Sequence, residues 1–294
     1  MIPKKISIKL DYYIMKNKIA IQGELGAYSH LAATKIFKNT KVIACKTFED
    51  VFKQCKKNKE VISVIPIENS LAGRVADIHY LLPKYKLKIV GEYYLPVEHC
   101  LLANHGVSLK QIKHVRSHSH AIGQCHKNLH KYKLTSVVAA DTAGSAKYIS
   151  ENKSKTEAAI ASSLAAKIYQ LKIIKKNFED QKGNTTRFLI MRKNYKFPKL
   201  VKQKKFITTC IFMIKSTPGA LFKALGGFAT HNVNLTKLES FSVNNTFLQT
   251  IFYLDIEGHA ENIFVKKALQ ELKKQTKKLD ILGIYLADSF RYKK

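Results

Sequence analysis

A short polar segment runs into an apolar strand and carries side chains that can act on a substrate. It is Asn-Thr-Thr-Arg-Phe at residues 184–188, and the predicted strand continues to residue 191. The hydroxyl of Thr186 can donate or accept a hydrogen bond. Arg187 can bind a carboxylate through two parallel hydrogen bonds, or it can hold the Thr186 loop through an ion pair. Taken alone, the segment also fits an ordinary polar turn that enters a strand.

Glu68, Asn69 and Ser70 form a second polar segment, directly after an apolar strand predicted over residues 61–67. Polar residues at the carboxyl end of a buried strand line binding crevices in open α/β sheets. Asn69 also fits the simpler role of a turn-forming residue after a strand. The segment therefore predicts one wall of a binding site, a turn, or both.

A third segment lies near the beginning of the chain, where a predicted strand over 19–21 meets Gly-Glu-Leu-Gly at 23–26. A helix is predicted next, with Tyr28 and Ser29 near its start. Unpaired backbone N–H groups at a helix start favour an anion. The third glycine of a dinucleotide fingerprint is missing, so we do not expect NAD to bind here.

Strands and helices alternate as far as residue 191, which predicts an α/β fold with two lobes around a cleft. After a basic linker the order changes to strand, helix, strand, strand, helix, strand, the ferredoxin-like βαββαβ pattern. The further strands before the linker are expected over 88–91, 98–103, 112–115, 137–139, 158–162 and 188–191, and the helices over 47–55, near 121, from 142 and over 163–169. The elements after it are expected over 206–214, 218–230, 234–242, 246–255, 260–276 and 279–286.

The composition describes a folded but very basic protein. Its formal net charge is +30, yet only five of its 51 basic residues are arginine and the lysines are spread along the whole chain. A nucleic-acid-binding protein concentrates its charge in a patch and uses arginine to read bases, so that function is a secondary alternative. The charge should instead help to attract an anionic substrate.

Cysteine usage and hydropathy indicate a cytoplasmic protein. The five cysteines contain no C-x-x-C pair, which disfavours a disulfide framework or a structural zinc site. The histidine-rich stretch over 114–130 has no accompanying metal-binding motif. No apolar run approaches the length of a membrane span. We expect neither a metal nor a signal peptide, and we expect residues 1–17 to be a short extension.

The segments together, in this order, resemble the prephenate dehydratases. The resemblance is carried by residues 23–30, 66–70 with Gly73, Gln124-Cys125, 141–144 and 184–188. The later βαββαβ unit, with Gly-Ala-Leu at 219–221 and Leu-Glu-Ser at 238–240, resembles the ACT regulatory domain of these enzymes. The resemblance implies a two-lobed, periplasmic-binding-protein-like catalytic domain over 18–195, a linker over 196–205 and an ACT domain over 206–290.

The resemblance also implies an activity. Prephenate dehydratases expel the ring carboxylate of prephenate as CO2 and its C4 hydroxyl as water, giving phenylpyruvate for phenylalanine synthesis without a cofactor. The resemblance marks Thr186, Asn69 and Gln124 as catalytic, although Gln124 also fits an exposed helical residue. The substrate-binding positions that it implies are Tyr28, Ser29, Glu68, Ser70, Thr142, Ala143 and Arg187. Those that it implies for regulation by phenylalanine are Gly219, Ala220, Leu221, Asn232, Glu239 and Ser240.

Two segments depart from the family pattern. The usual His-Pro-Gln is here His118-Ser119-His120. Loss of the proline frees the backbone of this loop and a histidine replaces the glutamine, so we expect activity with an altered substrate affinity. The usual Glu-Ser-Arg-Pro of the ACT domain continues after Ser240 as Phe241-Ser242. Replacing arginine by phenylalanine removes a charged hydrogen-bonding group, so we expect weak or absent feedback inhibition.

Several alternatives stay open at this point. An arogenate dehydratase shares the fold and motifs and differs in taking an amino rather than a keto side chain. A two-lobed small-anion-binding protein without catalysis would share the cleft. Only eighteen residues precede residue 19, too few for the mutase domain fused to some relatives, so we expect a monofunctional enzyme. The family further implies a homodimer or homotetramer.

Overall fold

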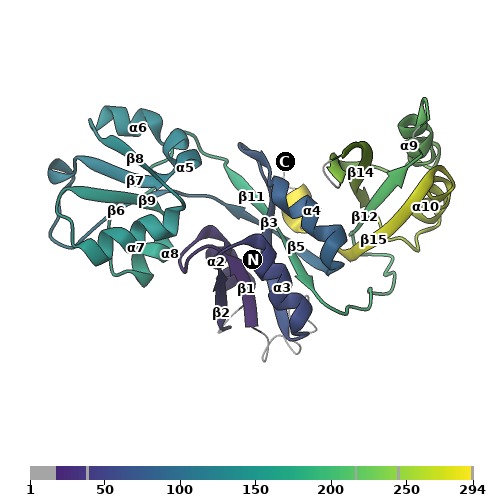
Figure 1. Cartoon of the computed structure of the whole chain (residues 1–294), viewed down its shortest axis with the longest axis horizontal. Helices are drawn as coiled ribbons and strands as arrows, with labels where there is room; N and C mark the ends of the chain where they lie inside the picture. Colours follow the sequence, from purple (N-terminus) through teal and green to yellow (C-terminus); the bar gives the residue numbers. More distant parts are fainter. Residues whose placement is uncertain (1–17, 38–39, 216, 244–245, 293–294) are drawn as a thin grey trace. The chain divides into compact units, whose positions relative to one another are not determined.

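The computed structural model describes residues 18–37, 40–215, 217–243 and 246–292. It divides into two compact units (Figure 1). Among the described residues, unit 1 combines 18–37, 40–54, 60–74 and 94–188, and unit 2 combines 55–59, 75–93, 189–215, 217–243 and 246–292. No helix among the described residues combines the length and apolar character needed to cross a membrane. All five cysteines are buried and free.

The first lobe of unit 1 is built on parallel strands. β1 (Lys18–Gln22) lies between β2 (Val42–Cys45) and β3 (Val61–Asn69) and pairs in parallel with both. The three central residues of β1 are fully buried, which explains its uninterrupted apolar sequence. β2 was not predicted, because its four residues are mostly half-exposed and give no clear apolar run. Helix α2 (Tyr28–Ile36) packs against β1 and β3, and helix α3 (Phe48–Lys57) follows β2.

The second lobe of unit 1 is a five-stranded sheet in the order β10-β6-β9-β7-β8 with helices on both faces (Figure 1). Alternate residues of β6 and β9 point to opposite faces and enter two separate apolar clusters, one with α5 and α6 and one with α7 and α8. The strands are β6 (Cys100–Ala103), β7 (His114–His118), β8 (Thr135–Ala139), β9 (Glu157–Ala161) and β10 (Lys172–Lys175). The helices are α5 (Ser119–Gln124), α6 (His126–Lys131), α7 (Thr142–Asn152) and α8 (Ser163–Ile168).

The glycine-containing turn after β1 joins the two lobes. The Ser162 hydroxyl donates to the Gly26 carbonyl at 2.6 Å, and the Tyr169 hydroxyl donates to the Leu25 carbonyl at 2.8 Å. Gly26 has a φ of +92°, and a Cβ there would lie 2.8 Å from the Cα of Ala165. This glycine is therefore required for its backbone conformation and for close packing against α8.

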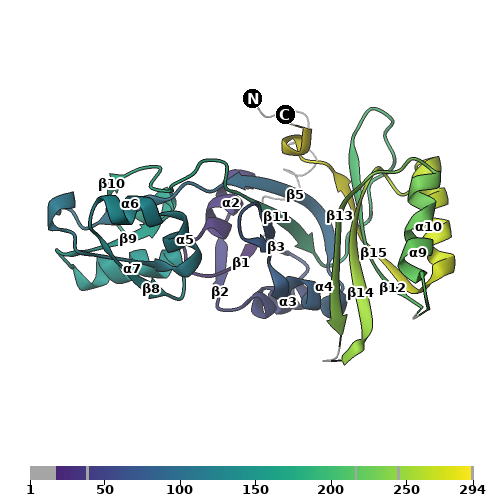
Figure 2. The ribbon, with the colours of Figure 1, turned by 90° about the horizontal axis from the view of Figure 1, so that it is seen from above.

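Unit 2 contains the predicted βαββαβ order, which is confirmed. Its strands are β12 (Phe206–Ile214), β13 (Leu235–Val243), β14 (Thr246–Glu257) and β15 (Thr276–Leu286), in the antiparallel order β13-β14-β12-β15. Helices α9 (Ala220–Thr230) and α10 (Ile263–Gln275) cover one face of this sheet (Figure 2). Helix α9 begins two residues later than predicted, because Gly219 rather than Pro218 forms its start.

Unit 2 also contains α4 (Ala76–Tyr85) and the first part of β5 (Lys88–Pro96). β5 pairs in parallel with β15, where Gly283 stands beside Ile89. A Cβ at Gly283 would lie 2.5 Å from the Ile89 carbonyl oxygen, so only glycine allows this pairing. The edge strand β13 packs against α4, where Phe241 lies 5.7 Å from the ring of His79 and 5.7 Å from that of Tyr80.

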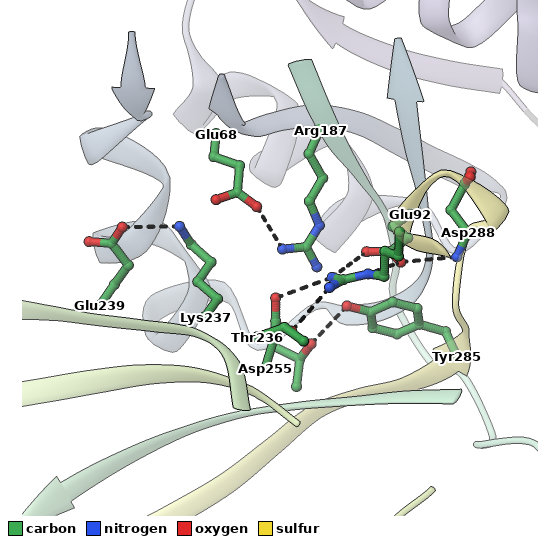
Figure 3. A network of polar contacts seen from close by, with 11 residues as sticks. Glu68, Glu92, Arg187, Thr236, Lys237, Glu239, Asp255, Tyr285 and Asp288 are labelled. Atoms are coloured by element: carbon green, nitrogen blue, oxygen red, sulfur yellow. Dashed lines mark hydrogen bonds and ion pairs between the residues drawn. The ribbon is translucent and has the colours of Figure 1, made fainter. Parts of the chain in front are cut away.

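A buried ion-pair cluster holds the C-terminal segment of unit 2 (Figure 3). Arg291 donates to both carboxylate oxygens of Glu92, at 2.6 and 2.8 Å, and to the Thr236 hydroxyl at 3.0 Å. Its guanidinium lies 3.7 Å from Asp255, which also accepts a 2.6 Å hydrogen bond from Thr209. The Glu92 and Asp255 side chains are fully buried, so Arg291 supplies the positive charge that makes their burial tolerable.

We predict that Arg291→Ala lowers the free energy of unfolding by about 3 kcal/mol, because it leaves buried carboxylates without their cation. Urea denaturation of the full chain measures this change. The matched control is Lys278→Ala, which removes an ion pair with Asp280 whose side chains are 55% and 43% exposed. That variant should change stability by less than about 1 kcal/mol. Equal effects of the two substitutions would contradict the assignment.

Candidate active site

Asn69 forms a turn at the end of β3 and reaches β11 (Thr185–Arg192) from it. Its side-chain oxygen accepts hydrogen bonds from the backbone N–H groups of Leu71, at 3.0 Å, and Ala72, at 2.9 Å. Its amide nitrogen donates to the Thr186 hydroxyl at 2.9 Å. The two roles considered for Asn69, turn former and site residue, are thus combined in one side chain.

Ser70 fastens the same turn to the segment before Thr186. Its hydroxyl accepts from the Thr185 N–H at 2.9 Å and lies 3.3 Å from the Gly183 carbonyl, to which it donates. Its own N–H donates to the Thr185 carbonyl at 2.9 Å. The Ser70 hydroxyl is therefore engaged in holding the loop, which fits a supporting role better than substrate contact.

The Thr186 hydroxyl is buried but keeps its hydrogen available. Only 8% of the residue is exposed, and its oxygen accepts the hydrogen bond from Asn69. No acceptor for the hydroxyl hydrogen is found among the residues that the structure describes. An N–H group directed at the oxygen stabilises the negative charge that grows there when the hydrogen is donated.

Gln124 ends α5 and faces Asn184, the residue two before Thr186. Its side-chain oxygen lies 2.8 Å from the Asn184 amide nitrogen and 2.8 Å from Nε2 of His99. Nδ1 of His99 lies 2.7 Å from the Tyr28 hydroxyl. Gln124 is therefore part of a half-buried polar contact and not an exposed helical glutamine. The hydrogen-bonded side chains Tyr28, His99, Gln124, Asn184, Asn69 and Thr186 are called the polar chain below.

Sequence reasoning missed His99 as a member of the site and did not assign a role to Asn184. His99 is 3% exposed, and burial lowers the pKa of its imidazole below the usual value, against smaller opposing effects of Gln124 and Glu179. Burial also raises the pKa of the Tyr28 phenol well above its usual value. A single histidine at the start of an apolar strand carries no motif, so nothing in its local sequence marked it.

Arg187 forms an ion pair with Glu68 inside unit 1 (Figure 3). Nη1 of Arg187 lies 2.9 Å from Oε1 of Glu68, and the arginine side chain is 1% exposed. Of the two roles considered for Arg187, this geometry favours holding the Thr186 strand over binding a substrate carboxylate. Glu68 remains partly open, with 31% of its side chain exposed.

The start of α2 offers backbone donors for a carboxylate. The residue before it, Ala27, makes no side-chain hydrogen bond to the first turn. Ser29 is 7% exposed and the Tyr28 hydroxyl is engaged with His99. The first-turn N–H groups and the Ser29 hydroxyl are therefore the groups of α2 that suit an anion.

Two segments of the second lobe that were predicted to join the site mainly form helix starts in the structure. Thr142 and Ala143 begin α7, whose first turn is capped by Asp141 through a 2.6 Å bond from the Gly144 N–H. Ala143 is fully buried, so its side chain belongs to the packing of the lobe. His118 caps α5 by accepting from the His120 N–H at 3.3 Å, which shows how this segment folds without a proline.

The residues expected to bind phenylalanine lie in unit 2 and only partly come together. Gly219, Ala220 and Leu221 line an open cavity of about 460 Å³ at the start of α9. Asn232 follows α9 with a φ of +52° and does not line this cavity. Glu239 and Ser240 lie on β13, where Glu239 accepts from Lys237 at 3.0 Å. Among the described residues, no three His, Cys, Asp or Glu side chains gather as a metal site.

Comparison with known proteins identifies the chain at the family level. A family model described as prephenate dehydratase matches residues 19–196. The chain belongs to the prephenate dehydratase family. The dehydratase is 41% identical over 276 residues to the bifunctional N-acyl-homoserine lactone acylase/prephenate dehydratase of Komagataeibacter europaeus, covering 94% of this chain and 98% of that one. It is 38% identical over 286 residues to arogenate dehydratase 2 of Petunia hybrida, covering 92% and 72% of the two chains.

A solved structure places the dehydratase in the same fold. The crystal structure of prephenate dehydratase from Arthrobacter aurescens in complex with L-Phe is 26% identical and has a TM-score of 0.85, covering 93% of this chain and 91% of that one. The predicted family, enzyme class and two-lobed α/β fold are confirmed by these likenesses.

We predict that Asn69→Asp distinguishes the role of Asn69 in the turn from its role as a donor to Thr186. An aspartate oxygen still accepts from the Leu71 and Ala72 N–H groups, but a carboxylate cannot donate to Thr186. The variant should still fold, although the Asn184 oxygen 2.6 Å from the Asn69 nitrogen also loses its donor. It should lose about 100-fold or more in kcat, the usual cost of one donor at a developing negative charge. The matched control is Asn152→Asp on the exposed part of α7, where turnover should not change. Full activity of Asn69→Asp would remove this donor from the mechanism.

Proposed function

We propose that this dehydratase converts prephenate to phenylpyruvate, CO2 and water in phenylalanine biosynthesis. The observation that carries the proposal is the Thr186 hydroxyl, which receives an N–H from Asn69 and keeps its own hydrogen for a substrate. The reaction needs such a group, because hydroxide is a poor leaving group unless it is hydrogen-bonded or protonated. Aromatisation of the ring supplies the driving force.

The proposed reaction requires one proton and no redox partner. The bond between the ring and its carboxylate breaks, CO2 departs, and the electron pair enters the ring. The bond between C4 and its oxygen breaks at the other end of the ring, and the oxygen leaves as water after taking one proton. Thr186 donates that hydrogen, Asn69 stabilises the remaining oxygen, and solvent restores the hydrogen after the products leave.

The remaining groups orient the two carboxylates of the substrate. The Gln124 amide nitrogen donates to the ring carboxylate or to the leaving hydroxyl, and the start of α2 with Ser29 binds the side-chain carboxylate. Arg187 and Glu68 act together by holding the strand that carries Thr186. Fixing the substrate in this way supplies much of the rate increase, because the chemical step itself needs only orientation and one hydrogen-bond donor.

We predict that Thr186→Val loses at least about 100-fold in kcat while Thr186→Ser retains most of it, because only the serine preserves the hydroxyl. Formation of phenylpyruvate from prephenate measures both. Running the same series with arogenate decides between the two substrates, because a higher kcat/KM for arogenate would make the chain an arogenate dehydratase. A Thr186→Val variant as active as the unmodified enzyme would exclude Thr186 as the donor.

The same preparation should also be assayed with an N-acyl-homoserine lactone. The Komagataeibacter europaeus relative is named for both activities, and this chain is similar to it along nearly its full length. Release of the free lactone would add a second activity, whereas its absence would leave the dehydratase proposal unaffected.

We propose that unit 2 contains a regulatory ACT domain over residues 206–290, in a homodimer or homotetramer, and that its response to phenylalanine is weak. The Arthrobacter aurescens relative was solved in complex with L-Phe, and the cavity beside Gly219, Ala220 and Leu221 supports a related role here. Phe241, which replaces the arginine expected from the family pattern, is 5% exposed and packs on α4. It therefore offers no charged group to an effector.

We predict that phenylalanine inhibits turnover of prephenate only weakly, because the Phe241 position lacks a charged donor. Inhibition should require phenylalanine concentrations far above the enzyme concentration in the assay. Titration of the purified full chain measures this, with tyrosine as the control ligand. Sharp inhibition at low phenylalanine concentration would contradict the proposed loss of regulation without affecting the assignment of the reaction.

A further inference from the structure

The hydrogen bonds of the polar chain converge on the Gln124 side-chain oxygen from His99 on one side and from Asn184 on the other, and the amide orientations are fixed at Asn69. Backbone N–H groups can only donate, so the Asn69 oxygen must face Leu71 and Ala72. The Asn69 nitrogen is thereby directed at the Asn184 side-chain oxygen, 2.6 Å away. An inverted Asn69 amide would set nitrogen against two N–H groups and lose both bonds.

The same constraint passes to Gln124. Because the Asn184 oxygen accepts from Asn69, its nitrogen is the atom that meets Gln124, and it donates to the Gln124 oxygen at 2.8 Å. Gln124 therefore keeps its nitrogen on the other side, where it makes no hydrogen bond with any residue that the structure describes. The orientation of Gln124 is thus set from outside its own helix.

His99 completes this arrangement. Nε2 of His99 lies 2.8 Å from the Gln124 oxygen, which has no hydrogen, so Nε2 must carry one. Nδ1 is then the acceptor in the neutral ring. The Tyr28 hydroxyl oxygen lies 2.7 Å from Nδ1 and 3.1 Å from the Glu98 carbonyl oxygen, so its one hydrogen goes to the nearer Nδ1. Burial favours this state on both sides, because it lowers the pKa of His99 and raises that of Tyr28.

We propose that His99 is a positioning residue, whose Nε2–H holds the Gln124 side-chain oxygen together with Asn184 and so leaves the Gln124 N–H groups for the substrate. The use of the Gln124 N–H groups by the substrate rests on the proposed function, whereas the position of the hydrogen on the His99 ring does not. The backbone of His99 is anchored independently, since its N–H donates to Glu179 at 2.7 Å and its carbonyl accepts from Phe178 at 2.8 Å. A change of the side chain therefore leaves the segment attached.

The first test measures the hydrogen on Nε2 directly in the unmodified protein. Two-bond ¹⁵N–¹H correlation spectra of the full chain, with histidines labelled in the ring, distinguish the two ring nitrogens at neutral pH. The His99 signals are assigned by their loss in His99→Gln. A hydrogen on Nε2 supports the proposal, and an Nε2 without hydrogen overturns it. This outcome stands whether or not the enzyme accepts prephenate, so it separates this inference from the proposed function.

The second test asks whether Gln124 depends on that hydrogen for turnover. His99→Leu removes the donor, and kcat should fall by about 100-fold, the usual cost of a misplaced catalytic group. His99→Gln can return an N–H to the same place and should recover at least about 10-fold of that loss. KM should change much less than kcat in both, whereas a merely structural role would lower the melting temperature of both alike and spare the kcat of the folded fraction.

The control is His105→Leu, which changes an exposed histidine and should leave turnover unchanged. Undiminished kcat in His99→Leu, or equal losses in the leucine and glutamine variants, would overturn the positioning role. If His99→Leu does not fold, the spectra of the unmodified protein still decide the state of the ring, and His99→Gln decides the effect on turnover.

Discussion

Two hydrogen bonds from the Leu71 and Ala72 backbone to the Asn69 oxygen determine which side-chain atoms donate and which accept in the site. They turn the chain at the end of β3, and they also leave the Asn69 nitrogen facing Thr186 and Asn184. Amides are symmetric in shape but not in hydrogen bonding, so one fixed amide orients the next through each shared contact. The neutral side chains of the polar chain thereby take one defined arrangement of donors and acceptors.

This neutrality suits the reaction. The substrate brings two carboxylates, and the products are a monocarboxylate, CO2 and water, so the site has to stabilise a shift of charge and not a fixed ion. Preorganised N–H and O–H donors do this without a large desolvation cost. Arg187 follows Thr186 in sequence, and Glu68 precedes Asn69. The two side chains form an ion pair that holds the strand, so their charges are engaged with each other.

Unit 2 shows the opposite use of charge. Arg291 binds two buried carboxylates, and this cluster fixes the C-terminal segment to β5 and to the sheet that carries the predicted regulatory residues. The Phe241 cluster on α4 adds an apolar contact to the same unit. Together these contacts explain how a sheet of the ferredoxin-like type is joined to a strand and a helix that precede it by more than a hundred residues.

Much of the fold followed from local patterns. The apolar runs of β1, β3 and β12 to β15 and the order βαββαβ were predictable because strands buried on one or both faces show their burial in sequence. The half-exposed β2 and the short β10 were missed because they show none. The motifs, taken in order, were enough to predict the family and to select Thr186, Asn69 and Gln124.

The sequence by itself determined which groups are available, and it could not determine which of them meet. Thr186 and Asn69 are 117 positions apart, and His99 and Gln124 are 25 apart, so no local pattern records these contacts. Only the tertiary structure paired Arg187 with Glu68, brought His99 to Gln124 and left the hydrogen of Thr186 available. The physical reason is that a hydrogen bond depends on distance and on donor direction, both of which arise when the strands and helices pack.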